Sequence, residues 1–286
     1  MKFVSFNIRE RASYGIATDR GIFDLGARIG KVIPTLQAYL EAAALGLAGP
    51  PPQATTADYG ANDVSYDPVI VSPRKIICVG LNYESHRLET GRKRLPRPAI
   101  FTRFADTLVG HQQPITRPSV STEVDYEAEL AVVVGRPAYR VTEARAHEFV
   151  AGYTCINDVS IRDWQQHNTQ FTPGKNFAAT APLGPTLVTP DEIDDLAQCA
   201  IESRLNGATM QSARLGDMTL GVAELIAYIS TFTRLSPGDV VATGTPGGVG
   251  FKREPPVFLR DGDVIEVLIA GVGHLINRVV DEPQAI

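Results

Sequence analysis

The sequence has few cysteines and no long apolar run, the features that mark disulfide-rich, zinc-binding and membrane proteins. Its three cysteines, Cys78, Cys155 and Cys199, lie far apart and form no Cys-x-x-Cys pair. This argues against a disulfide framework or a zinc knuckle and favours a reducing compartment. No apolar run approaches the roughly 18–20 residues that span a bilayer, and the N-terminus lacks the apolar core of a signal peptide. We therefore expect a cytoplasmic protein without a membrane partner.

Clusters of basic residues that would bind nucleic acid are also scarce. The formal net charge is −5, and the chain has no arginine-rich arm, so we expect no nucleic-acid partner. What the chain does have is ordinary globular composition, with 44% hydrophobic and 21% charged residues. Its 286 residues allow one large domain and a small one.

The distribution of turn residues divides the chain into two predicted units. Residues 1–33 are typical of short strands with turns, and residues 35–46 have helical spacing. The segment 48–64, rich in Pro, Ala and Thr, is the best candidate for a linker. We therefore predict a small N-terminal domain over 1–70 and a larger domain over 71–286.

The larger unit reads as strands with intervening helices. We predict a strand over 125–134, a helix over 142–153 with Thr142 as its N-cap, and an amphipathic helix carrying Val222, Leu225, Ile226 and Ile229. The helices do not alternate strictly with the strands, which favours an α+β fold over a doubly wound sheet.

The stretch VDYEAELAVVVG, residues 124–135, contains an unusual pair of charges. A strand has a side-chain period of two, so Glu127 and Glu129 point to the same face. One interpretation is the solvated face of an edge strand. The run of valines instead favours a central strand, where a divalent cation shared with Asp158, in CINDVS, would make the carboxylates tolerable. Ligation by oxygen alone favours Mg²⁺, Mn²⁺ or Ca²⁺ over zinc.

Three further motifs carry candidate functional residues. His86 and Glu89 are three residues apart, so a helical turn would pair them as a general acid/base or simply as a surface salt bridge. Lys175, in GKNF, is either a loop lysine or a buried cation near the metal. The glycine-rich segment ATGTPGGVG lacks the features of a nucleotide-binding loop. The backbone N–H groups of this turn and the hydroxyl of Thr245 could still bind a carboxylate.

The segment that follows His86 is a local basic cluster in an acidic protein. It contains Arg87, Arg92, Lys93, Arg94 and Arg97. This cluster is either a solvated loop or an attractor for a second carboxylate at the far end of a substrate. The second interpretation favours dicarboxylates such as maleylpyruvate or fumarylpyruvate.

An ordered set of motifs over residues 73–281 resembles the fumarylacetoacetate hydrolase superfamily, in particular bacterial hydrolases of acylpyruvates. The motifs are GLNYESH, DYEAELAVVVG, NDVSIRDWQ, GKNF with PLGP, SPGDVVATGTPGGVG and PPVFLRDGDVIEV. The resemblance implies a mixed β-sandwich roll around a Mg²⁺ or Mn²⁺ site and a homodimer formed through the catalytic domain. Four positions depart from the family's usual pattern: Arg103 stands where lysine is frequent, Ala178 and Ala179 stand where an Asp-Thr pair is usual, and Leu215 stands where threonine is common.

The resemblance also implies a role for each candidate residue. Glu127, Glu129 and Asp158 match the metal ligands, and His86, Glu89 and Lys175 match catalytic groups, the first two on a mobile lid. The expected contacts to substrate are Arg162, Gln165, Thr245 and Arg103.

The resemblance favours metal-dependent hydrolysis of a C–C bond in an acylpyruvate-type 2-oxo acid during breakdown of aromatic compounds. In that chemistry a Lewis-acidic metal stabilises an enolate. The same enolate occurs in decarboxylation of oxaloacetate and in keto–enol isomerisation, so a decarboxylase and a hydratase or isomerase of 2-oxo-dienoates stay open. A non-catalytic 2-oxo acid binding protein is the alternative from another class.

Overall fold

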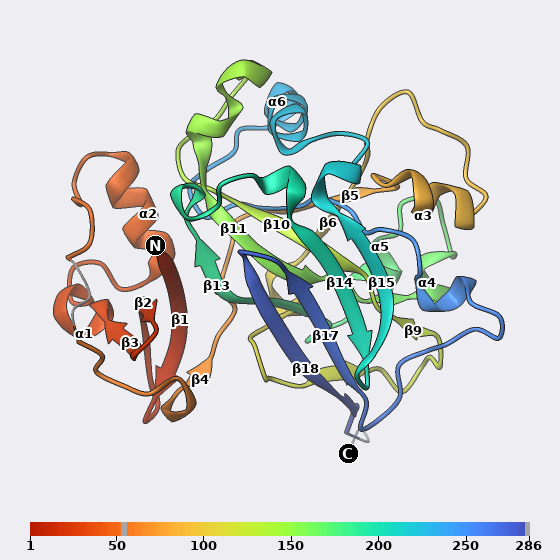
Figure 1. Ribbon diagram of the computed structural model, residues 1–286, viewed down its shortest axis with the longest axis horizontal. Helices are drawn as coiled ribbons and strands as arrows, with labels where there is room; N and C mark the ends of the chain where they lie inside the picture. Colours follow the sequence, from red (N-terminus) through yellow and green to blue (C-terminus); the bar gives the residue numbers. More distant parts are fainter. Residues whose placement is uncertain (53–55, 284–286) are drawn as a thin grey trace.

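The computed structural model describes residues 1–52 and 56–283. Strands dominate it, as Figure 1 shows. Their bounds are β1 Lys2–Ile8, β2 Arg11–Thr18, β3 Gly21–Asp24, β4 Ser65–Tyr66, β5 Ile76–Gly80, β6 Ala99–Arg103, β7 Leu108–Val109, β8 Ile115–Arg117, β9 Val124–Asp125, β10 Ala128–Val134, β11 Val150–Asn157, β12 Ser160–Ile161, β13 Ala181–Val188, β14 Ala200–Leu205, β15 Ala208–Arg214, β16 Val240–Ala242, β17 Val264–Ile269 and β18 Gly273–Asp281.

The α-helices are short and lie between strands. Their bounds are α1 Leu25–Ile29, α2 Leu36–Ala44, α3 Glu84–Glu89, α4 Arg162–Gln165, α5 Thr172–Lys175 and α6 Val222–Phe232. In the described residues the strands form a sheet of 11, a sheet of five and a pair. The large sheet runs β3-β2-β1-β13-β11-β10-β16-β5-β6 with β4 and β7 at its sides, and the small one runs β15-β14-β17-β18-β8. Mixed sheets with interspersed helices confirm the predicted α+β class.

Strand β10 lies in the middle of the large sheet, as its valine run predicts. It pairs antiparallel with β11 on one side and with β16 on the other, and each of its residues is buried. Its even-numbered residues, from Ala128 to Val134, pack with Ile201, Val267 and other residues of the five-stranded sheet. Its odd-numbered residues Ala131 and Val133 face the opposite core, so Glu129 lies on that second face.

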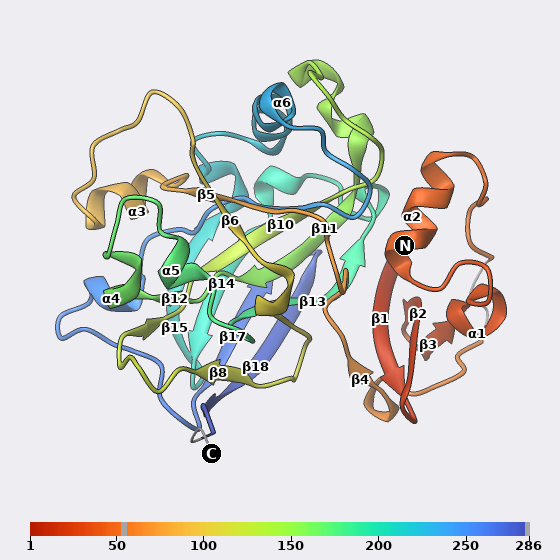
Figure 2. The same cartoon turned by 180° about the vertical axis from the view of Figure 1, so that it is seen from behind.

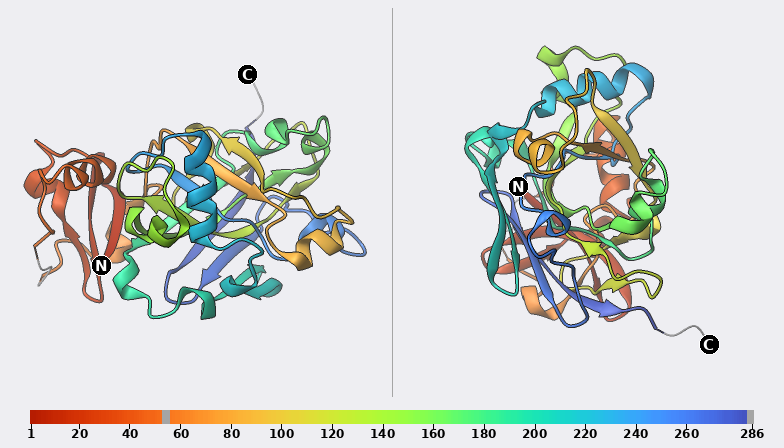
Figure 3. Two further views of the ribbon diagram at one scale, coloured as in Figure 1. Left: turned by 90° about the horizontal axis from the view of Figure 1, so that it is seen from above. Right: turned by 90° about the vertical axis from the view of Figure 1, so that its right-hand side faces the viewer.

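The N-terminal strands continue the large sheet. Strand β1 pairs with β13 through Lys2–Val188 and Phe3–Leu187. In Figures 1 and 2, β1–β3 with α1 and α2 lie at one end of the molecule, and α3, α4 and α5 lie at the other. The view from above in Figure 3 shows the same separation. A domain boundary at residue 70 stays a prediction, and residues 53–55 of the predicted linker lie outside the described part of the chain.

Two of the predicted helices have different outcomes. The amphipathic helix is α6, which buries Leu225, Ile226 and Ile229 in a hydrophobic cluster that also contains residues of β5, β10 and β14. The helix predicted over 142–153 is wrong: Glu143–Phe149 forms 3-10 turns, and residues from Val150 onward belong to β11. Thr142 makes no side-chain cap, and the central sheet takes up the β-branched residues that follow. No helix in the described residues has the length and apolar character needed to cross a membrane.

Candidate active site

Glu127, Glu129 and Asp158 meet in the interior of the protein. Each offers a carboxylate oxygen, and the three atoms lie within 4.8 Å of one another. The residues are 5%, 2% and 0% exposed, which excludes the solvated edge-strand interpretation. The register of the sheet causes this meeting: Ala128 pairs with Asn157, and the N–H of Asp158 donates to the carbonyl of Glu127 at 2.9 Å.

Three cationic side chains surround these carboxylates. Lys175 Nζ lies 2.7 Å from Glu127 Oε2 and 2.5 Å from Asp158 Oδ2. Arg162 Nη1 lies 2.7 Å from Glu127 Oε1, and Arg103 Nε pairs with Asp158 Oδ1. Among the described residues no cation pairs with Glu129, whose Oε2 accepts only the N–H of Gly244, at 2.8 Å.

The carboxyl groups are therefore held in unlike electrostatic environments. For Glu127, burial opposes the charged form, but Lys175 and then Arg162 outweigh it and hold the pKa below its usual range. For Glu129, burial and then the charges of Asp158 and Glu127 raise the pKa well above its usual range. Glu129 is thus the carboxylate that most needs an additional positive charge.

The cluster fits a divalent cation. Four carboxylates, with Asp125 included, face three cationic side chains, and Glu129 has no ion-pair partner in the described chain. All of the candidate ligand atoms are oxygens, the donor type that Mg²⁺ and Mn²⁺ prefer. Glu127, Glu129 and Asp158 would hold the ion, and Lys175 and Arg103 hold these carboxylates in place.

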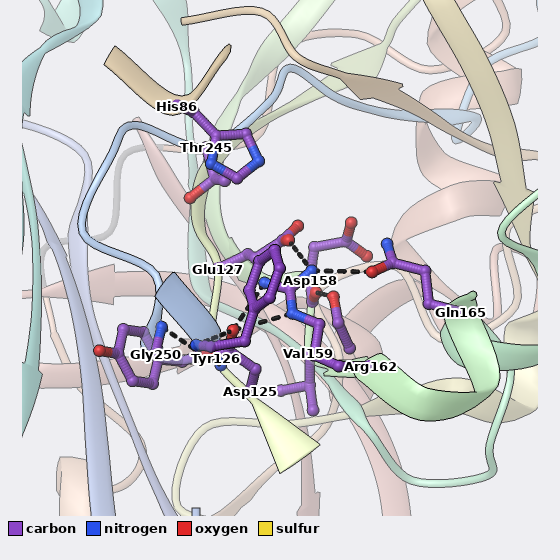
Figure 4. Close-up of polar contacts among 12 residues, drawn as sticks. His86, Asp125, Tyr126, Glu127, Asp158, Val159, Arg162, Gln165, Thr245 and Gly250 are labelled. Atoms are coloured by element: carbon purple, nitrogen blue, oxygen red, sulfur yellow. Dashed lines mark hydrogen bonds and ion pairs between the residues drawn. The ribbon is translucent and has the colours of Figure 1, made fainter. Parts of the chain in front are cut away.

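A cavity of about 500 Å³ opens onto the cluster. This volume is within the range of sites for small molecules. Its wall includes Glu127, Glu129, Lys175, Arg162, Gln165, Thr245 and His86. In Figure 4, His86 and Thr245 lie on one side of the carboxylates and Gln165 on the other. The structure therefore brings seven of the predicted residues around one space.

His86 and Glu89 form a close pair on α3. His86 Nδ1 lies 2.7 Å from Glu89 Oε1, and His86 is 7% exposed. Because Nδ1 faces the carboxylate, Nε2 is the ring nitrogen left for a ligand. The pair belongs to the cavity wall through His86, so a simple surface salt bridge does not describe it.

A glycine-rich loop, residues 243–251, connects α3 to the carboxylates. Its backbone N–H groups donate to side chains of several separate elements. The bonds are Gly244 to Glu129 at 2.8 Å, Gly247 to Ser85 at 3.1 Å, Gly248 to Glu89 at 2.8 Å and Gly250 to Asp125 at 2.8 Å. Gly248 has φ +107, and a Cβ there would lie 2.3 Å from the carbonyl oxygen of Met210, so this position requires glycine.

Two buried residues support the site and were not predicted from the sequence. Asp125 Oδ2 accepts from Arg162 Nε at 2.8 Å, which orients the guanidinium toward Glu127. Gln211, 1% exposed, donates from Nε2 to Thr245 Oγ1 at 2.7 Å. Asp125 could have been found as the first acid of the alternating series Asp125, Glu127, Glu129, whereas no local pattern marks Gln211.

Arg103 has a different position from the one expected. Its side chain is fully buried and pairs with Asp158, and it also donates to Val159 O and reaches Thr180 Oγ1 at 3.4 Å. It is absent from the cavity wall. Arg103 therefore positions a carboxylate in this structure, and a direct contact to substrate stays a prediction.

The basic segment after His86 divides into different environments. Arg87 pairs with Glu84 at 2.6 Å, whereas Arg92 lies in the wall of the cavity together with Lys252. Lys93, Arg94 and Arg97 line a neighbouring depression between α3 and α6. Within this segment Arg92 is thus the basic side chain that lines the cavity beside the carboxylates.

Comparison with known proteins places the chain among relatives of several activities. Residues 75–280 match the family described as Fumarylacetoacetate (FAA) hydrolase C-terminal. The mitochondrial oxaloacetate tautomerase fahd2 of Xenopus laevis is 46% identical over 213 residues, which cover 74% of this chain and 67% of that protein.

Two of the solved structures that resemble this one match nearly the whole chain. In each case the match covers 99% of this chain and 100% of the other chain. Fumarylacetoacetate hydrolase from Exiguobacterium antarcticum has a TM-score of 0.84 and 34% identity. Maleylpyruvate hydrolase from Sphingobium sp. SYK-6, in complex with manganese(II) and pyruvate, has a TM-score of 0.76 and 26% identity. The motifs, the fold and these similarities agree, and the chain belongs to the fumarylacetoacetate hydrolase family.

Proposed function

We propose that this protein is a Mg²⁺- or Mn²⁺-dependent enzyme that interconverts the enol and keto forms of oxaloacetate or a similar 2-oxo dicarboxylate. One arrangement carries the proposal: three buried carboxylates and a cavity-facing His86 meet in a single small space. The reaction named for the relative from Xenopus laevis, at 46% identity, supports this choice within the family.

Tautomerisation requires one proton to leave and another to arrive. The enol loses its proton from the oxygen on C2, C3 gains a proton, and the C2=C3 double bond becomes a C2=O double bond. A divalent cation bound by Glu127, Glu129 and Asp158 would supply Lewis acidity toward the C2 oxygen. His86 Nε2 is the atom we assign to carry the proton, because Glu89 holds Nδ1 and stabilises the imidazolium.

Lys175 and Arg162 act by charge and position. Both side chains are buried, and both are paired with Glu127, so they keep positive charge beside the place where negative charge develops. Arg92, in the cavity wall, would attract the second carboxylate of a dicarboxylate substrate.

Hydrolysis of an acylpyruvate is the second candidate function. It is favoured by the intact pair of His86 and Glu89, which could activate water for attack on a distal carbonyl. The maleylpyruvate hydrolase complex with manganese(II) and pyruvate adds support from a relative of the same fold. Decarboxylation of oxaloacetate uses the same enolate and is tested in the same assay.

The test is a product assay on the purified protein with Mn²⁺ or Mg²⁺. Enol oxaloacetate, maleylpyruvate, fumarylpyruvate and acetylpyruvate are supplied in turn, and loss of enol absorbance is measured separately from release of pyruvate. Loss of enol oxaloacetate without pyruvate supports the tautomerase. Pyruvate from an acylpyruvate establishes the hydrolase, and pyruvate from oxaloacetate alone establishes a decarboxylase.

His86→Gln should abolish the activity that is found. His147→Gln, a change at an exposed histidine, is the matched control and should leave it intact. Binding of oxalate and Mn²⁺ without any turnover would instead support a 2-oxo acid binding protein. A homodimer also stays a proposal, which sedimentation equilibrium tests directly.

A further inference from the structure

The carbonyl oxygen of Gly248, in the glycine-rich loop, is held by two side chains. Tyr126 OH donates to it at 3.2 Å, and Arg253 Nε donates to it at 3.3 Å. Arg253 Nε also lies 3.1 Å from Tyr126 OH, and Nη2 of the same guanidinium donates to the carbonyl of Met210. Tyr126 is 0% exposed, and Arg253 is half-buried. One arginine therefore connects Gly248 to a buried tyrosine and, through Met210, to β15.

The loop itself does little to fix the orientation of Gly248. Gly247 and Gly248 are consecutive, and glycine has the weakest conformational preference of all residues. The N–H of Gly248 nevertheless has a defined target, Glu89 Oε2, at 2.8 Å. Contacts from outside the loop must set this direction, and those made to the carbonyl of Gly248 come from Tyr126 and Arg253.

Arg253 has the chemistry that such a support needs. Its three acceptors are neutral oxygens, and within the described part of the chain its guanidinium pairs with no carboxylate. Hydrogen bonds from an ionised donor are roughly twice as strong as those between neutral groups. Neither Arg253 nor Tyr126 lines the cavity, so any effect they have on a reacting ligand must pass through Gly248.

We propose that Arg253 is a positioning residue for the proton carrier. Together with Tyr126 it fixes Gly248, the N–H of Gly248 holds Glu89 Oε2, and Glu89 Oε1 holds His86 Nδ1. The inference rests on the proposed function, because that function assigns the proton to His86 Nε2. It adds a residue that touches neither the cavity nor α3 and yet sets the position of the imidazole.

Three variants and one control test this support. Arg253→Met removes every bond of the guanidinium, Arg253→Lys keeps a cation, and Tyr126→Phe removes one donor to Gly248. Arg204→Met is the matched control, because Arg204 is also half-buried but pairs with Glu202 on β14. The turnover found in the product assay is measured as kcat and KM, and affinities for Mn²⁺ and oxalate are measured by isothermal titration calorimetry.

We expect Arg253→Met to lower kcat by about tenfold, the size of one hydrogen bond, with KM and both affinities nearly unchanged. Arg253→Lys should restore part of the loss, and Tyr126→Phe should show a smaller one. Arg204→Met should behave as the wild type. A general loss of structure would instead raise KM and weaken both affinities, and that result would overturn the inference.

A double-mutant cycle shows whether Arg253 acts through Glu89. Once Glu89→Ala has removed the carboxylate, adding Arg253→Met should cause no further loss of kcat. Two losses that multiply would overturn the inference while leaving the proposed function intact.

A second readout needs no turnover. Trypsin cleavage after Arg92 and Arg94, in the segment that follows α3, reports how firmly α3 is held. Arg253→Met and Glu89→Ala should each speed this cleavage, the double variant no more than Glu89→Ala alone, and Arg204→Met not at all. Wild-type protein without turnover would overturn the proposed function, whereas cleavage of Arg253→Met at the wild-type rate would overturn the inference.

Discussion

Glu89 accepts a hydrogen bond of 2.8 Å from the backbone N–H of Gly248 through Oε2, while its Oε1 faces His86 Nδ1. One carboxylate thus orients the imidazole and attaches α3 to the glycine-rich loop. Because the same loop donates to Glu129 through Gly244, the position of the proton carrier is tied to that of the metal ligands. The glycine-rich loop therefore links the position of α3 to the position of Glu129.

Glu89→Gln separates the two roles of this carboxylate. The amide oxygen still accepts from Gly248, but the neutral side chain no longer stabilises a protonated His86. We expect the rate of the chemical step to fall by about 10²–10⁴-fold, with affinity for Mn²⁺ unchanged. Steady-state kinetics and calorimetry measure the two effects, and Glu84→Gln, on the exposed side of α3, is the control. Wild-type activity in Glu89→Gln would contradict the assigned role.

Ser85→Ala weakens the docking of α3. It removes the bond from Gly247 N–H to Ser85 Oγ, which stabilises the docked state by about 1 kcal/mol. The basic segment with Arg92 and Arg94 follows α3 directly, so we expect faster cleavage there by trypsin. Ser119→Ala, at an exposed serine bonded to Glu282, should not change the rate. Unchanged cleavage in Ser85→Ala would show that this bond does not hold α3.

Lys175→Met leaves two buried carboxylates without their shared cation. Nζ contacts both Glu127 and Asp158, and breaking a buried ion pair costs about 3–5 kcal/mol. In chelator we expect the free energy of unfolding in urea to fall by about that amount, and saturating Mn²⁺ should restore part of it. Lys75→Met breaks the pair with Asp239 away from the cluster, so its loss of stability relative to the wild type should be the same with and without Mn²⁺. A loss of equal size with and without Mn²⁺ would contradict the metal site.

Glu129→Gln should change stability and metal affinity in opposite directions. Burial, Asp158 and Glu127 raise the pKa of Glu129, so the folded protein holds this proton more tightly than the unfolded chain. Stability of the metal-free protein therefore falls as pH rises above the ordinary carboxyl range and toward the raised pKa. Glutamine carries no such penalty. We expect the variant to unfold at higher urea concentration in chelator at neutral pH, yet to bind Mn²⁺ more weakly. Lower stability in chelator would contradict this account.

His111 makes the stability of the fold sensitive to acid. Burial, assisted by nearby His274, lowers the pKa of His111 from 6.5 to about 4. Its Nδ1 accepts from the N–H of Ile276 at 3.1 Å, a bond that needs the neutral ring. The stabilising contribution is complete above pH 6.5 and is lost as pH falls to about 4.

His111→Gln keeps an acceptor but does not titrate. As the pH is lowered over this range, we expect the free energy of unfolding of the variant to fall less than that of the wild type. The difference between the two falls is about 1–2 kcal/mol, a value reduced because the ring is partly exposed. Urea unfolding across the range measures the difference. Parallel curves for the two proteins would show that His111 does not carry this dependence.

Local patterns in the sequence were sufficient for several parts of this protein. The period of two places Glu127 and Glu129 together, the valines place them in a central strand, and the spacing of three pairs His86 with Glu89. Each of these relations lies within one element, where backbone geometry alone decides which side chains share a face.

Only the tertiary structure decided the contacts that hold the site together. Arg103 meets Asp158 across 55 positions of the chain, and Gln211 meets Thr245 across 34. The expected α-helix over 142–153 failed because pairing in the central sheet outweighs local propensity. Contacts of this kind depend on which strands pair and in which register, and the spacing of residues along a single chain carries no information about either.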